Sequence, residues 1–68
     1  MTRLRINGVE ADVAAATIAE LLASRGVDPK ARFVAVAVNG AVVHRAEWPQ
    51  AALNADDDVE IVRPLQGG

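Results

Sequence analysis

The chain has 68 residues, with 7 Lys and Arg against 9 Asp and Glu, a formal net charge of -2 and no cysteine. A domain of this size buries only about 60% of the surface that its unfolded chain exposes, which excludes a second lobe and argues against a self-sufficient enzyme. Without Cys there is no disulfide framework, thiolate metal site or cysteine nucleophile, and an acidic chain with 3% aromatic residues is a poor candidate for nucleic-acid binding.

The first 13 residues predict a β-hairpin. Residues 2–6 and 9–13 both alternate polar and apolar side chains, and Asn7-Gly8 between them suits a type I′ turn, in which both central residues have positive φ. This register places opposite charges across the strands in two pairs, Arg3 with Asp12 and Arg5 with Glu10.

A short helix is predicted to begin after Thr17. Thr17 and Glu20 have the spacing of a capping box, in which each side chain accepts a backbone N–H that the helix leaves unpaired. Gly26 suits a left-handed cap at the other end, and Pro29 prevents the helix from resuming. The predicted apolar stripe consists of Ile18, Leu21 and Leu22.

The second half of the chain predicts three more strands. Residues 33–38 form a Val-rich apolar run typical of a strand. A turn at Asn39-Gly40 connects this strand to a partner strand, with Val38 opposite Ala41. Residues 45–53 predict a short irregular helical turn, residues 54–58 an acidic turn, and residues 59–63 a last alternating strand.

The order of these elements is strand, strand, helix, strand, strand, short turn, strand. This order predicts the α+β class with a ubiquitin-like β-grasp fold, in which a mixed sheet of about five strands packs on one helix. We expect residues 1–63 to form this domain and residues 64–68 to form a flexible tail that closes on Gly67-Gly68. Five extended residues reach about 16 Å, enough to place a terminal carboxylate in a partner's active site.

With these features the sequence resembles the ThiS sulfur carriers of thiamine biosynthesis, within the ubiquitin-like and MoaD-like proteins. The resemblance covers the whole chain and is most specific in its second half. It rests on residues 36–40, Val42-Val43-His44-Arg45, Trp48, Leu53, residues 59–62 and Gly67-Gly68. Two positions depart from the family pattern: His44 replaces the usual proline, and Asp56 replaces the usual glycine.

The resemblance implies that the reactive group is the main-chain carboxylate of Gly68, with Gly67 allowing the tail to enter a narrow site. A ThiF-like adenylyltransferase would use ATP and magnesium to form an acyl-adenylate at Gly68. A persulfide donor would then supply sulfur, and a ThiG-like thiazole synthase would consume the resulting thiocarboxylate. The chain itself is expected to bind no cofactor or metal and to act as a protein-borne substrate.

The alternation of the predicted strands places a row of small apolar side chains on the sheet face away from the helix, where a monomer would favour polar ones. We interpret this row, together with the tail residue Leu65, as a partner-binding surface. Its members are Ala35, Ala37, Val42, Val62 and Leu65.

Three other residue groups receive structural interpretations. Trp48 is expected to pack against the sheet, although aromatic residues are also enriched at interfaces. His44 has no identifiable carboxylate partner and is expected to be an exposed loop residue. Residues 56–58, three consecutive Asp, lack the spacing of a calcium loop and are expected to form a solvated turn.

Two alternative functions remain open at this point. A molybdopterin synthase small subunit would use the same tail chemistry for another acceptor, and a non-carrier β-grasp module would need only its surface for interaction or nucleic-acid binding. The sequence contains no run near the ~18 apolar residues of a membrane span and no signal-peptide pattern. We therefore expect a cytoplasmic protein, monomeric when free, that binds neither membrane nor nucleic acid.

Overall fold

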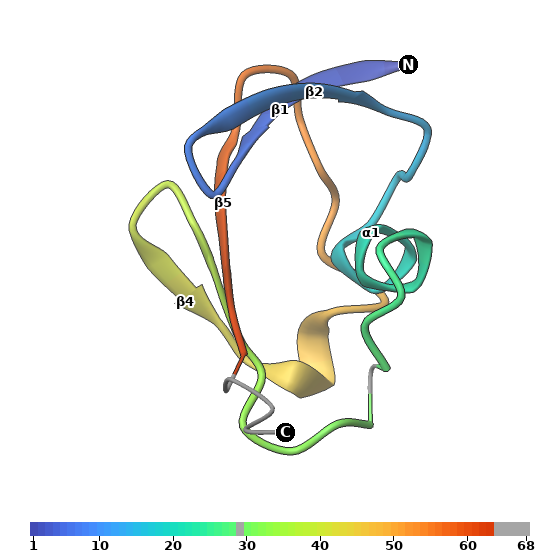
Figure 1. Ribbon diagram of the computed structural model, residues 1–68, viewed down its shortest axis with the longest axis vertical. Helices are drawn as coiled ribbons and strands as arrows, with labels where there is room; N and C mark the ends of the chain where they lie inside the picture. Colours follow the sequence, from blue (N-terminus) through green and yellow to red (C-terminus); the bar gives the residue numbers. More distant parts are fainter. Residues whose placement is uncertain (29, 64–68) are drawn as a thin grey trace, which may run out of the picture.

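The computed structural model describes residues 1–28 and 30–63, and Figure 1 shows their arrangement as a curved sheet beside one α-helix. Within these residues, the elements follow in the order β1 (Thr2–Ile6), β2 (Val9–Val13), α1 (Ile18–Ser24), β3 (Ala35–Val38), β4 (Ala41–Val43), the 3-10 helix η1 (Arg45–Glu47) and β5 (Asp58–Val62). This is the α+β arrangement that the order of the sequence patterns predicts.

The five strands form one mixed sheet in the order β2-β1-β5-β3-β4. Only β1 and β5 run parallel among the described pairs; β1 with β2, β3 with β4, and β3 with β5 are antiparallel. The last strand in sequence therefore lies in the centre of the sheet. Two hairpins that are separate in sequence become one sheet because β5 pairs with both of them.

Both hairpins have the predicted turns and registers. Asn7 and Gly8 have φ values of 50° and 84°, and Asn39 and Gly40 have 52° and 85°, as a type I′ turn requires. Cross-strand partners agree with the prediction along both hairpins, from Arg3 with Asp12 to Val38 with Ala41.

The caps of α1 also form, with one difference at the N-terminus. The Thr17 hydroxyl accepts the N–H of Glu20 at 3.2 Å, but the Glu20 carboxylate accepts the N–H of Ala16, at 2.9 Å, rather than that of Thr17. Thr17 is instead paired with Ala52 in an isolated β-bridge, which ties the helix start to the segment before β5. At the other end Gly26, with φ of 74°, permits the backbone bonds of a Schellman cap.

The core lies between α1 and one face of the sheet. The fully buried side chains come from β1, α1, β3, β5 and the loops, and partly buried side chains of β2 and β4 pack against them. Complete burial of an aliphatic side chain contributes about 1.5–3 kcal/mol relative to exposure. The buried apolar residues are Leu4, Ile6, Ile18, Leu21, Leu22, Val27, Val36, Trp48, Leu53 and Val59. Trp48 is therefore a packing residue, as expected, and its indole Nε1–H donates to the carbonyl of Val43 at 3.0 Å.

Three predicted details of the strands were wrong. The third strand begins at Ala35 rather than at residue 33, because Phe33 has a left-handed φ of 66° that interrupts an extended chain. The last strand begins one residue earlier than predicted, at Asp58, and ends at Val62 rather than at Arg63. In the first hairpin, Glu10 forms its ion pair with Arg3 rather than with Arg5, although its backbone lies opposite Arg5.

The asparagines of the two turns hold β5 in place from both sides. Asn7 Oδ1 accepts the N–H of Ile61 at 2.8 Å, and its Nδ2 donates to the carbonyl of the same residue at 3.3 Å. Asn39 Oδ1 accepts the N–H of Asp58 at 2.9 Å. The strand that leads to the C-terminal tail is thus fixed by side chains as well as by its two neighbouring strands.

Candidate functional site

The sheet face opposite α1 has an apolar half formed by β3, β4 and the end of β5. Strand pairing places Ala35 beside Val62 and Ala37 beside Val42. The two valines are 69% (Val42) and 59% (Val62) exposed, Ala35 is exposed, and Ala37 is half-buried. The structure therefore brings together the four described residues of the predicted row, which we call the apolar face. One carboxylate, that of Glu60, stands beside Ala37 on this side of the sheet.

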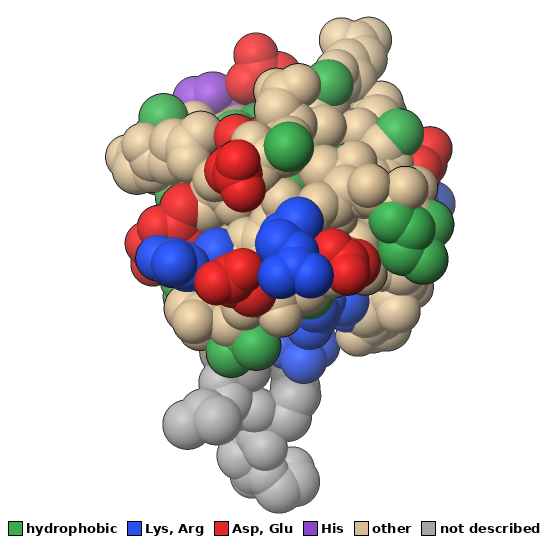
Figure 2. All heavy atoms as spheres, turned by 90° about the horizontal axis from the view of Figure 1, so that it is seen from above, with side chains coloured by type: hydrophobic (Ala, Val, Ile, Leu, Met, Phe, Trp, Pro, Cys, Tyr) green, Lys and Arg blue, Asp and Glu red, His purple; other side chains and the backbone are tan. Residues whose placement is uncertain are grey.

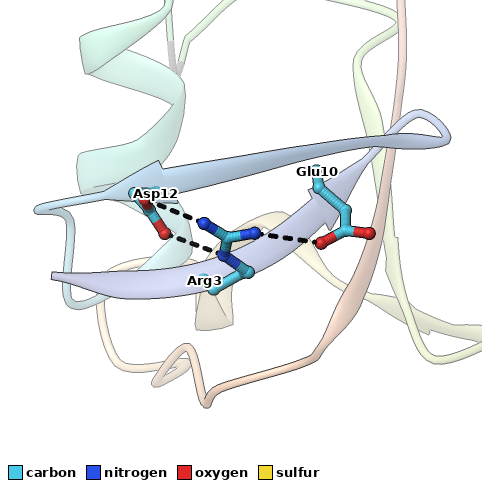
Figure 3. A network of polar contacts seen from close by, with 3 residues as sticks. All are labelled: Arg3, Glu10 and Asp12. Atoms are coloured by element: carbon cyan, nitrogen blue, oxygen red, sulfur yellow. Dashed lines mark hydrogen bonds and ion pairs between the residues drawn. The ribbon is translucent and has the colours of Figure 1, made fainter.

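The other half of the same side, on β1 and β2, is charged. Arg3 Nε lies 3.1 Å from a carboxylate oxygen of Asp12, and its Nη1 lies 3.3 Å from one of Glu10 (Figure 3). Hydrogen bonding to Asp12 raises the pKa of Arg3, with a smaller contribution from Glu10, so the guanidinium stays charged. A view onto this end of the molecule shows basic and acidic side chains interleaved in a band (Figure 2). Mixed charge of this kind suits a solvated surface.

The apolar face reaches the end of β5. Val62 is the last residue of β5 and a member of the face, and the Asn7 bonds hold the backbone of Ile61 immediately before it. The tail residues named from the sequence, Leu65, Gly67 and Gly68, lie outside the described residues. The structure thus fixes the chain as far as Arg63.

The segment after β4 is held by Arg45 and Trp48. The Arg45 guanidinium lies over the Trp48 ring, 4.9 Å from its centroid, and donates to the carbonyl of Ala31 in the loop before β3. The arginine and tryptophan of the sequence motif therefore join η1 to that loop. His44 caps η1 without a side-chain bond, is exposed, and has φ of -69°, a value that proline also adopts.

The three consecutive aspartates have different environments. Asp56 is exposed with φ of 69°, which explains why glycine suits this position. The expectation of a solvated turn is wrong for Asp57, which is buried. Its carboxylate accepts from Asn39 Nδ2 and from the N–H of Asn54, each at 2.9 Å, and these bonds compensate for its burial. Its oxygens are thereby used within the fold. Within the described part of the chain, no group of three or more His, Asp and Glu is placed to hold a metal ion.

The model of the ThiS family matches residues 4–68, which is nearly the whole chain. The chain belongs to the ThiS family. A search of curated protein sequences finds no match.

The solved structures that resemble this ThiS-family protein along its length include the following two. One is the crystal structure of the thiamine biosynthesis protein ThiS from Geobacter metallireducens, 30% identical, with a TM-score of 0.78, covering 98% of this chain and 100% of that one. The other is a solution NMR structure of a thiamine biosynthesis protein from the same organism, with the same identity and TM-score, covering 98% of this chain and 88% of that one. The predicted ubiquitin-like β-grasp fold is confirmed by these similarities.

Sequence reasoning missed two features of this region. It assigned Phe33 to a strand, whereas the residue lies in a turn with its side chain 78% exposed. It also read the asparagines only as turn residues, because their bonds to β5 join residues up to 54 positions apart.

No helix in residues 1–28 or 30–63 has the length and apolar character needed to cross a bilayer.

Proposed function

We propose that this ThiS-family protein is a sulfur carrier of thiamine biosynthesis whose Gly68 carboxylate is converted to a thiocarboxylate. The observation that carries the proposal is the family match, which extends through Gly67-Gly68. The similar solved structures, both described as thiamine biosynthesis proteins, support the thiamine branch over the molybdopterin branch. The protein would then be a substrate of other enzymes rather than a catalyst.

The proposed chemistry needs only the main chain of Gly68. A carboxylate is a poor electrophile, so an adenylyltransferase would let its oxygen attack the α-phosphorus of ATP, with pyrophosphate as the leaving group. A persulfide sulfur would displace AMP from the acyl-adenylate and form an acyl disulfide. A second thiol would then attack the other sulfur of that bond, which releases the thiocarboxylate and leaves a disulfide on the sulfur donor. A thiazole synthase would take its sulfur from this group. ATP and magnesium would belong to the activating enzyme.

Two features support this role, one in the described fold and one in the sequence of the tail. The apolar face offers an exposed surface next to the point where the tail begins, which would let a partner hold the domain while it receives the carboxylate. The tail of residues 64–68 would reach about 16 Å when extended, far enough to leave the domain outside the partner's active site. Glycine at the last two positions adds no Cβ in such a tunnel.

ATP–pyrophosphate exchange with the adenylyltransferase tests the proposal directly. One added residue after Gly68, or deletion of Gly68, displaces the carboxylate by about 3.3–3.6 Å and should abolish exchange. Gly67→Ala keeps the length and should slow exchange less. Melting curves of all three variants serve as the folding control. Exchange at the wild-type rate by the extended protein, without trimming back to Gly68, would refute the carrier function.

A growth experiment separates the two carrier branches. Deletion of the gene should create a requirement for the thiazole part of thiamine and leave molybdenum-cofactor enzymes active. Growth without thiazole, together with loss of molybdenum-cofactor activity, would assign the protein to the molybdopterin branch instead. Intact mass offers a direct readout of the product, because sulfur in place of oxygen adds about 16 Da to the chain.

A further inference from the structure

Phe33 is a bulky apolar residue with a left-handed backbone and an exposed side chain, and no contact within the described part of the domain accounts for this combination. Its φ of 66° is left-handed, a region that is unfavourable for a bulky side chain and natural for glycine. The ring is 78% exposed and does not belong to the core, so burial does not compensate for the strain. Strained exposed residues of this kind are retained at functional sites more often than elsewhere.

Basic residues surround the same loop. Arg32 and Arg63 line a surface hollow of about 680 Å³, and Asp28 is the only acidic residue among the described residues that line it. Lys30 lies in the same loop, where its N–H bonds the Asp28 side chain at 2.8 Å. We call Lys30, Arg32 and Arg63 the basic collar. It holds three of the seven Lys and Arg in a chain whose net charge is -2.

The collar and Phe33 lie at the end of the molecule where the described chain stops. In Figure 1 the loop before β3 and the end of β5 meet at the same end of the fold. Val62 lines the hollow and also belongs to the apolar face. Its cross-strand partner is Ala35, which follows Phe33 by two residues. The loop that holds Phe33 and the basic collar therefore lies at the same end of the sheet as Ala35 and Val62 of the apolar face.

We propose that Phe33 is an aromatic anchor, and the basic collar an electrostatic guide, for the enzyme that activates the tail. This inference rests on the proposed function. The partner it fits has an apolar pocket for the Phe33 ring, bordered by acidic side chains, at the entrance of the site that receives Gly68. An acidic border follows from charge complementarity, because positive charge is concentrated at this end of an otherwise acidic chain.

The ring is tested by comparing Phe33→Gly, Phe33→Ala and Phe33→Tyr in ATP–pyrophosphate exchange at saturating ATP. The first two should raise the KM for the carrier by about tenfold, the size expected for loss of an aromatic anchor, with little change in kcat. Phe33→Tyr should retain the wild-type KM. Phe33→Gly should melt at or above the wild-type temperature, because it relieves the left-handed strain, so weaker binding could not be attributed to unfolding. Val9→Ala, at an exposed apolar residue of the β1–β2 hairpin, is the matched control and should change nothing.

The collar is tested by removing one charge at each end of the molecule. Arg32→Gln and Arg5→Gln change the net charge equally, but only Arg32→Gln should raise the KM and weaken its dependence on salt concentration. Equal effects of the two variants would attribute the change to total charge and overturn the guiding role of the collar.

The possible outcomes separate this inference from the proposed function. If the wild-type protein supports no exchange, the carrier function itself fails. If it exchanges and Phe33→Gly leaves the KM unchanged, the anchor is refuted while the carrier function stands. Sedimentation of the free protein covers a third case: a wild-type dimer that Phe33→Gly converts to a monomer would assign the ring to a second copy of the chain and also refute the anchor.

Discussion

The side-chain amide of Asn39 donates to the buried carboxylate of Asp57 across 2.9 Å, joining the β3–β4 turn to the loop before β5. The oxygen of the same amide accepts the N–H of Asp58. Asparagine alone among the residues that favour a type I′ turn offers both a side-chain donor and an acceptor here. The turn residue is thus also a support for the strand that carries the tail.

Asn39→Asp should destabilise the domain by about 2–3 kcal/mol at neutral pH. The substitution keeps the shape of the side chain but replaces the donor with an oxygen that faces the Asp57 carboxylate. Urea unfolding followed by the fluorescence of the single Trp measures the loss. Gln50→Glu makes the same chemical change at an exposed position and should alter stability by less than about 0.5 kcal/mol. Equal stabilities of the two variants would contradict the support described here.

Asp56→Gly and Asp56→Ala should differ in their effect on the free energy of unfolding. At φ of 69°, alanine carries the full cost of the left-handed conformation, about 1 kcal/mol, whereas glycine adopts it without strain. We therefore expect Asp56→Gly to match or exceed the wild-type free energy of unfolding and Asp56→Ala to fall below it. The reverse order in thermal unfolding would show that the Asp56 side chain itself stabilises the loop.

His44→Pro should fold normally and gain up to about 1 kcal/mol of stability, because the residue already has φ of -69° and the preceding Val43 is extended. The gain arises from the smaller conformational freedom of the unfolded chain. Thermal unfolding checks the stability, and the fluorescence of Trp48 checks that η1 keeps its place. A marked loss of stability would mean that the His44 N–H has a bonding role that proline removes.

Val62→Asp and Ala37→Asp should weaken binding to the activating enzyme by about tenfold or more while the domain stays folded. Both substitutions place a charge on the apolar face, where a docked partner would bury it. Titration calorimetry with the purified enzyme measures affinity, and circular dichroism checks folding. Ala14→Asp makes the same change at an exposed residue of the β2–α1 connection and should bind like the wild type. If the two variants on the apolar face bind with unchanged affinity, this surface does not dock the activating enzyme.

The sequence by itself determined the local structure of this protein. Alternation and the Asn-Gly pairs predicted both hairpins with their registers, and Thr17, Glu20 and Gly26 predicted the ends of the helix. Local geometry depends on near neighbours, so these signals sit within a few residues of the structure they predict. The same alternation predicted the apolar face, because parity along a strand assigns each residue to one side. The chemistry of Gly68 came only from resemblance to a family.

Only the tertiary structure decided which distant groups meet. It placed β5 between the two hairpins and buried Asp57, which accepts a hydrogen bond from Asn39. It also paired Glu10 with Arg3, a diagonal neighbour, rather than with the residue opposite it. It also placed Phe33 before the strand in which it was expected, with a strained backbone and an exposed side chain. Each outcome depends on packing or hydrogen bonding with segments far away in the chain, and such competition between partners leaves no periodic trace in the sequence.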